Sequence, residues 1–319
     1  MLFSPLLARD YVSRSERNLV ALLSSPWLSS PSISARSRIT YRVDGCMSHG
    51  RKTGTMLNII SLGAGVQSST MALMAAHGEI TPMPDGAIFA DTGWEPQVVY
   101  EWLAWIETKL PFEVIHVRRP GLDLGEYSID IANNEVPRGS IPPWYLDKPD
   151  GMLPIQCSKE FKTRPVQNKI REILGLRPGQ CGPKSIKVRQ WIGISLDEAH
   201  RMKPCELKYI QNYWPLIEMR MNRGDCLGWM EAKGYPQPPK SSCIFCPFKG
   251  DQQWASMRNY APNDWAKAVK FDAQIRPGYH GMIGMAYVHK QRVPLDQVMF
   301  RHDGQLDMFG NECEGMCGV

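Results

Sequence analysis

The sequence predicts an α/β protein with a doubly wound, mostly parallel sheet, followed by a smaller, loop-rich, Cys-containing C-terminal region. Two observations predict this fold class. Strand-like and helix-like segments alternate from residue 56 to about residue 119, and prolines return and elements shorten after Pro204. Alternating strands and helices are typical of a parallel sheet with covering helices.

Each element of the first half has its own local signal. A buried strand is expected where an apolar run is short, and a helix where apolar residues recur at helical spacing. Gly78 is expected to close the first helix, and Pro96 to start the second. The expected elements are strand LNIISL (57–62), helix 68–77, strand GAIFADTG (86–93), helix PQVVYEWLAWIETKL (96–110) and strand FEVIHVRR (112–119).

The second half is less regular. Residues 120–158 have no period and several prolines, so a long surface loop is expected there. A soft boundary near residue 205 is expected to divide an α/β domain, 56–204, from the C-terminal region, 205–319. Further elements are expected as a helix from Thr163 to Gly175, a strand at 185–195, and helices at 222–233 and 262–275.

Charge and composition exclude several classes of protein. The net charge of +5 belongs to residues 1–55, which hold eight basic and three acidic residues; the other 264 residues hold 29 of each. We therefore expect 1–55 to be a disordered leader, or a segment upstream of a true start at Met56, with a transit peptide as the third interpretation. The balanced core does not indicate a nucleic-acid partner. No apolar run is long enough for a membrane span.

The stretch SLGAGVQSST, residues 61–70, joins the first strand to the first helix. Ligands of parallel sheets bind at the carboxyl ends of strands, where a turn's amides and a helix N-terminus attract anions. Gly63 and Gly65 are expected to allow backbone conformations that a side chain would block. Hydroxyl groups add donors. The stretch therefore predicts a phosphate cradle, and the alternative is an ordinary turn with an N-cap serine.

The second strand also ends in polar residues. Asp91 and Thr92 precede Gly93, and a carboxylate and a hydroxyl at that edge are suited to the ribose or amino edge of a nucleotide. The alternative is a simple Asp-Gly turn.

Together with four later motifs, these two stretches form an ordered set that resembles the phosphoadenylyl-sulfate (PAPS) reductase family, within the PP-loop or adenine nucleotide alpha-hydrolase-like superfamily. The set covers roughly residues 57–250, and its order is more specific than any one motif. Its members are SLGAGVQSS, DTGWEP, LPIQCSKEFKTRPV, WIGISLDEAHR, YWPLIEMRMNRGDCLGWMEAKG and SSCIFCPF.

The resemblance implies an adenine nucleotide, either PAPS or ATP, with Mg²⁺ if ATP is the substrate. Many PP-loop ATPases carry Ser-Gly-Gly-x-Asp-Ser, whereas Gln67 stands at the aspartate position here and looks more like sulfonucleotide reductases. Basic residues between 158 and 190 are expected to add phosphate partners. The expected nucleotide-binding residues are Ser61, Gly63, Gly65, Gln67, Ser68, Ser69, Asp91, Thr92, Gly93, Lys162 and Arg201.

Nine cysteines in a chain that needs no disulfide framework indicate reduced thiols in a cytoplasm. Cys243 and Cys246 have the spacing that lets two thiolates bind one tetrahedral metal ion. Cys157 and Cys226 are expected to complete four sulfur ligands. Spacing does not separate zinc from iron, and the resemblance favours a 4Fe-4S cluster.

Glu312-Cys313 resembles the Glu-Cys-Gly near the C-terminus of the reductases, which implies that Cys313 is the nucleophile. The expected function is therefore thiol attack on a sulfonucleotide, with a thioredoxin-like reductant. The first alternative is an ATP pyrophosphatase or adenylating sulfurtransferase that modifies a small molecule or nucleic acid. The second is a non-catalytic nucleotide- or metal-binding accessory protein.

Overall fold

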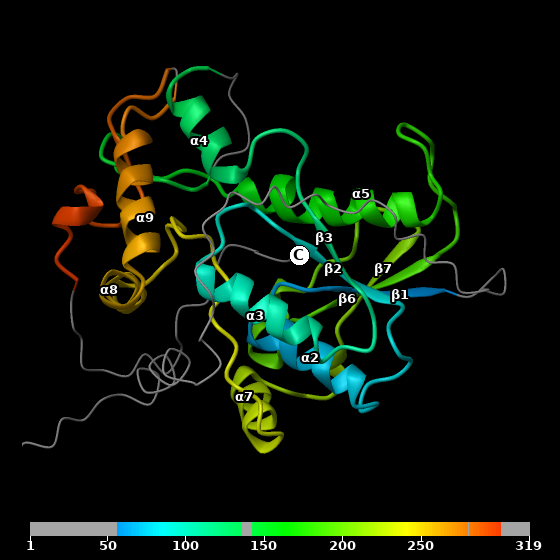
Figure 1. The fold of residues 1–319 in the computed structure, drawn as a ribbon. Helices are drawn as coiled ribbons and strands as arrows, with labels where there is room; N and C mark the ends of the chain where they lie inside the picture. The colour runs from blue at the N-terminus through cyan, green and yellow to red at the C-terminus, as the bar shows by residue number, and fades with distance from the viewer. Residues whose placement is uncertain (1–55, 136–141, 280, 301–319) are drawn as a thin grey trace, which may run out of the picture. The chain divides into compact units, whose positions relative to one another are not determined.

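Five parallel strands form the central sheet of the computed structural model, which describes residues 56–135, 142–279 and 281–300. Their order is β3-β2-β1-β6-β7, and every neighbouring pair is parallel (Figure 1). The chain order therefore reverses between β1 and β6, which is where parallel α/β sheets bind ligands. The strands are β1 (Leu57–Ser61), β2 (Gly86–Ala90), β3 (Val114–Val117), β6 (Val188–Ile192) and β7 (Ile210–Tyr213).

Helices cover both faces of this sheet because the strands are apolar on both sides. Within β2, Ala87 and Phe89 join one core cluster, whereas Ile88 and Ala90 join another. Figure 1 shows α5 on one side of the sheet and α2 and α3 on the other. The doubly wound, mostly parallel α/β class is confirmed. The covering helices are α2 (Val66–Ala76), α3 (Gln97–Glu107), α7 (Arg223–Ala232) and, on the opposite face, α5 (Arg164–Ile173).

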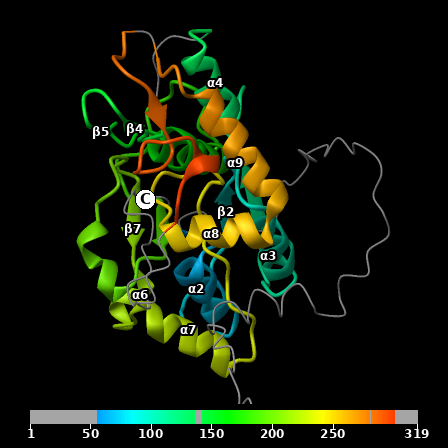
Figure 2. The same ribbon diagram turned by 90° about the vertical axis from the view of Figure 1, so that its left-hand side faces the viewer.

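A third apolar cluster lies around three other helices and a small antiparallel sheet. Buried Asp272 organises part of it: its carboxylate accepts hydrogen bonds from Val288 N at 2.9 Å and Leu295 N at 3.1 Å. Figure 2 shows these helices together. The elements are α4 (Leu124–Ala132), α8 (Asp251–Tyr260), α9 (Pro262–Gln274), β4 (Tyr145–Leu146), β5 (Gly151–Met152) and β8 (Ala286–Tyr287).

The structure differs from the sequence expectation in the less regular second half of the chain. The expected loop over 120–158 contains α4, whose N-terminus is fixed by a capping box between Asp123 and Glu126. β7 pairs with β6 across the soft boundary expected near residue 205, and the division into two domains stays a prediction. The short elements α6 (Pro215–Glu218), a π-helical turn (Lys159–Thr163) and 3₁₀ turns at Leu196–Arg201 and Leu295–Gln297 complete the description.

Within the described ranges, every helix is too short or too polar to cross a membrane.

Candidate functional site

A cleft opens at the carboxyl ends of β1 and β6. It holds about 1020 Å³ of empty space, a value that includes the open solvent at its mouth. It contains seven of the eleven predicted nucleotide-binding residues. Those seven are Ser61, Gly63, Gly65, Gln67, Ser68, Lys162 and Arg201.

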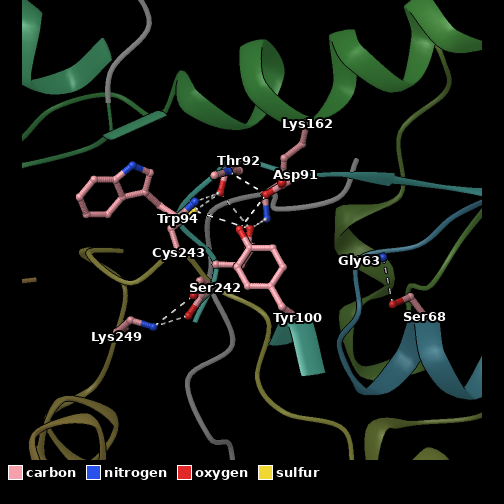
Figure 3. A network of polar contacts seen from close by, with 12 residues as sticks. Gly63, Ser68, Asp91, Thr92, Trp94, Tyr100, Lys162, Ser242, Cys243 and Lys249 are labelled. Atoms are coloured by element: carbon pink, nitrogen blue, oxygen red, sulfur yellow. Dashed lines mark hydrogen bonds and ion pairs between the residues drawn. The ribbon is translucent and has the colours of Figure 1, made fainter. Parts of the chain in front are cut away.

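The turn between β1 and α2 forms one wall of this cleft. Ser68 Oγ accepts a hydrogen bond from Gly63 N at 3.2 Å, which folds the turn back onto the helix (Figure 3). The left-handed residue is Ala64, with φ of 57°, so the expectation that Gly63 and Gly65 supply special backbone conformations was wrong. No side chain caps α2. The first amides of a helix lack intrahelical partners, so they are suited to binding an anion.

Gly193 allows β6 to pass directly against this turn. A Cβ atom there would lie 2.7 Å from both Cα and N of Ser68. Gly193 belongs to the motif WIGISLDEAHR, but its role could not be predicted because only the tertiary contact shows why a side chain is excluded.

Four cationic side chains line the cleft. Lys162 precedes α5 and Arg201 ends the 3₁₀ turn after β6, whereas Arg223 and Lys240 come from α7 and the loop after it. Arg223 and Lys240 were not predicted as site residues from the sequence, because they lie far along the chain from the predicted cradle. Burial lowers the pKa of the Arg223 guanidinium, and the carboxylates of Glu198 and Asp197 oppose that shift. The cleft is thus built to receive negative charge.

A polar network crosses the floor of the cleft. The side-chain amide of Gln67 donates to Glu198 Oε2 at 3.3 Å and to Ser195 Oγ at 3.4 Å. Glu198 Oε1 accepts from Arg201 at 2.6 Å. Arg201 Nε is buried, with no hydrogen-bond partner among the described residues. A buried unpaired donor is costly, so this nitrogen is available to a ligand oxygen.

Ser69 does not reach the cleft. It is fully buried, and its hydroxyl accepts a hydrogen bond from Trp102 Nε1 of α3 at 2.9 Å. One residue along a helix rotates a side chain by about 100°, so Ser69 points to a face of α2 different from that of Ser68. The prediction that Ser69 binds nucleotide was wrong.

The turn that follows β2, residues 91–93, is not part of the cleft lining. Asp91 Oδ1 accepts from Gly93 N and from Tyr100 Oη, both at 2.8 Å, and Oδ2 pairs with Arg118. Burial, and then the Asp91 carboxylate, raise the pKa of Tyr100. Gly93 has φ of 81°, and a Cβ there would lie 2.6 Å from Asp123 Cβ. Asp91 and Gly93 therefore shape a turn, and their nucleotide role stays a prediction.

A second, mostly apolar cavity lies beyond this turn. Three cysteines line it, Cys157, Cys243 and Cys246, together with Thr92 and Lys162. Lys162 also lines the cleft, so it belongs to both cavities. We call this second space the thiol cavity. Figure 3 shows Thr92, Trp94 and Cys243 gathered near Lys162.

Glu95 connects these residues and was not singled out from the sequence. Its side chain is fully buried and its Oε1 pairs with Lys162 Nζ at 3.2 Å. The same oxygen accepts from Thr92 Oγ1 at 3.2 Å and Cys243 Sγ at 3.8 Å. One carboxylate thus touches the lysine that the two cavities share and a thiol of the second.

The four predicted metal ligands are not assembled. Cys226 lies in α7 and packs in the core beside α2 and α3, where burial raises its pKa to about 12. In the described parts of the chain, no three His, Cys, Asp or Glu residues are grouped to hold a metal ion. The four-thiolate set therefore does not fit, and a metal role for Cys157, Cys243 and Cys246 stays a prediction. Cys313, the predicted nucleophile, lies outside the described residues.

No protein-family model matches the chain, and no curated protein matches it. Among solved structures, the chain is similar to the crystal structure of a PAPS reductase from Candida auris in a phosphate complex. The two are 11% identical with a TM-score of 0.37, over 57% of this chain and 74% of that one. The chemistry of the site is therefore inferred from this chain's own residues.

Proposed function

We propose that this protein is a PAPS reductase-like enzyme that binds an adenine nucleotide in the cleft and carries out sulfur chemistry on it. One observation carries the proposal. An uncapped helix N-terminus and four cationic side chains line the same cleft, at the strand ends where the sheet order reverses. Amides and cations placed together in this way suit the phosphates of a nucleotide.

The cleft also offers a place for the base. Phe89 and Ala90 of β2, Val166 of α5 and Ile192 of β6 line it with apolar surface. A flat aromatic base is suited to such a surface, while its phosphates lie at the polar end of the cleft. The turn between β1 and α2 therefore holds phosphate, and the apolar strand ends hold the base.

The reaction we propose is thiol attack on a sulfonucleotide. A cysteine thiolate, predicted to be that of Cys313, forms a bond to the sulfonyl sulfur while the bond from that sulfur to the phosphate oxygen breaks. The nucleotide leaves as its phosphate, and the enzyme keeps an S-sulfonate. A dithiol protein of the thioredoxin type then attacks the cysteine sulfur and releases sulfite. Cationic side chains stabilise the charge that develops on the leaving phosphate.

ATP-dependent adenylation is the second candidate because the four cations of the cleft also suit a pyrophosphate leaving group. In that reaction the substrate attacks the α-phosphate of ATP, pyrophosphate leaves, and the adenylated substrate accepts sulfur. The two candidates share the cleft and differ in the product that is released.

The test uses the full-length, reduced protein with a thioredoxin-type reductant. We expect sulfite release from labelled PAPS, and its loss in Cys313→Ser. Isothermal titration with adenosine 3′,5′-bisphosphate should show binding that Lys240→Gln weakens by roughly tenfold, since one phosphate contact of about 1.4 kcal/mol is lost. The matched control Lys267→Gln alters an exposed lysine of α9 and should leave affinity unchanged. Pyrophosphate release from ATP without sulfite release would select the second candidate, and no binding of any adenine nucleotide would overturn both.

A further inference from the structure

We infer that the cleft takes its nucleotide free of a divalent cation, with protein side chains in place of Mg²⁺. The inference rests on the proposed function, since it requires that the cleft binds a nucleotide. It further specifies that the nucleotide binds as an anion without a bound Mg²⁺ ion. The argument depends on which carboxylates reach the cleft and what they already contact.

Glu198 is the carboxylate among the described residues that line the cleft. Both of its oxygens are engaged. Oε1 accepts from Arg201 at 2.6 Å and Oε2 accepts from Gln67 at 3.3 Å. An enzyme that binds Mg²⁺-nucleotide typically offers one or two carboxylates to the ion, with the phosphates completing its shell. Glu198 is instead neutralised by a guanidinium.

The carboxylates near the cleft are committed as well. Asp91, at the end of β2, uses Oδ1 for Gly93 N and Tyr100 Oη and uses Oδ2 for Arg118. Asp197 accepts from Arg223 N at 3.1 Å. Recruiting Asp91 as a metal ligand costs a hydrogen bond or an ion pair that the fold already makes.

In the first turn of α2, the side chain that faces the cleft carries a neutral amide and not a carboxylate. Gln67 is buried, lines the cleft and donates its amide hydrogens toward Glu198. A neutral amide oxygen is a weaker ligand for Mg²⁺ than a carboxylate, and this side chain presents its donors to the network. The network therefore presents no pair of available carboxylates.

Positive charge is supplied by the protein itself. Lys162, Arg201, Arg223 and Lys240 all line the cleft. A Mg²⁺ ion on the phosphates would place two further positive charges among them, and like charges at such distances repel. Phosphates that are already complexed with Mg²⁺ also offer fewer oxygens to guanidinium and ammonium groups. The cleft is thus complementary to the bare anion.

The first experiment is isothermal titration of the full-length protein with ATP and with adenosine 3′,5′-bisphosphate, in EDTA and then in excess MgCl₂ at matched ionic strength. We expect both nucleotides to bind in EDTA. ATP should bind roughly tenfold more weakly when it is saturated with Mg²⁺. If ATP binds only with Mg²⁺, or binds more tightly when Mg²⁺ is present, the inference is overturned and the proposed function stays intact. No binding under either condition overturns the proposed function as well.

The second experiment introduces a carboxylate that could bind a metal ion in the cleft. Gln67→Asp places a carboxylate beside Glu198, and Gln67→Asn is the matched neutral control. Electron paramagnetic resonance of Mn²⁺ with ATP should show a protein-bound ternary complex for Gln67→Asp, and free Mn²⁺-ATP for wild type and Gln67→Asn. A wild-type ternary complex overturns the inference. Thermal melting checks the fold of each variant, and the wild-type measurement decides the question even where a variant fails to fold.

Discussion

The cleft and the thiol cavity share Lys162 but are built in opposite ways. Strand ends, a helix N-terminus and side chains from four segments form the cleft, which is rich in donors and positive charge. The thiol cavity is lined by prolines, aromatic rings and three cysteines, from loops that the third core cluster supports. The comparison teaches that the cationic cleft is built around the ends of the sheet strands, whereas the arrangement of thiols depends on distant loops packing together.

We expect the largest effect when the ion pair between Lys162 and Glu95, which connects the two cavities, is removed. Lys162→Met leaves the Glu95 carboxylate fully buried without its cation, and losing one partner of a buried pair costs about 3–5 kcal/mol. Denaturant unfolding should show this loss, and the double variant Lys162→Met/Glu95→Gln should recover part of it because no buried charge remains.

Lys233→Met is the matched control for that cycle. Its partner Glu79 and Lys233 itself are both about a third exposed, and exposed pairs contribute less than about 1 kcal/mol. Equal losses for the two lysine variants would mean that the Glu95–Lys162 pair is no different from a surface pair.

The next effect tests whether the cleft depends on close backbone packing. Gly193→Ala places a methyl group 2.7 Å from the backbone of Ser68, so β6 and the first turn of α2 must separate. Overpacking of this kind costs roughly 1–3 kcal/mol, and we expect nucleotide affinity to fall by a corresponding factor of about 5 to about 150.

Gly63→Ala serves as its control on the same cleft. A Cβ there would lie 3.6 Å from Ser68 Oγ, an ordinary contact. Titration calorimetry and thermal melting should therefore show a clearly smaller effect for Gly63→Ala. If the two alanines act alike, the close approach at Gly193 is unimportant.

The smallest effect concerns Cys226, which was expected to complete a set of four sulfur ligands and lies in the sheet core. Burial raises its pKa from 9.0 to about 12. A thiol whose folded pKa is raised stabilises the fold below pH 9, and that contribution is lost as pH rises from about 9 to about 12. The slope is at most about 1.4 kcal/mol per pH unit.

Unfolding free energies of wild type and Cys226→Val between pH 7 and pH 10.5 measure this slope. We expect the variant to lose less stability than wild type above pH 9. Alkylation at pH 8 gives a second readout, because exposed Cys181 should react and Cys226 should not. Rapid native-state labelling of Cys226 would contradict its place in the core.

Local pattern was sufficient for most of the sheet. Apolar runs and their spacing predicted β1, β2, β3 and β6. The rule that parallel sheets bind ligands at their carboxyl ends placed the predicted cradle between β1 and α2, where the cleft lies. Local pattern missed α4, because the capping box Asp123–Glu126 is short and lies in a stretch whose prolines suggested a loop. It also missed β7, whose pairing with β6 is a tertiary contact.

The sequence by itself determined the α/β class and the position of the turn between the first strand and the first helix, since both depend on residues that are neighbours in the chain. Tertiary structure decided which side chains share a cavity. It brought Arg223 and Lys240 to the cleft, turned Ser69 into the core, placed Glu95 between Lys162 and Cys243, and separated Cys226 from the other thiols. The physical reason is that the rotation of a helix and the packing of a loop fix where a side chain points, and neither is encoded in local spacing.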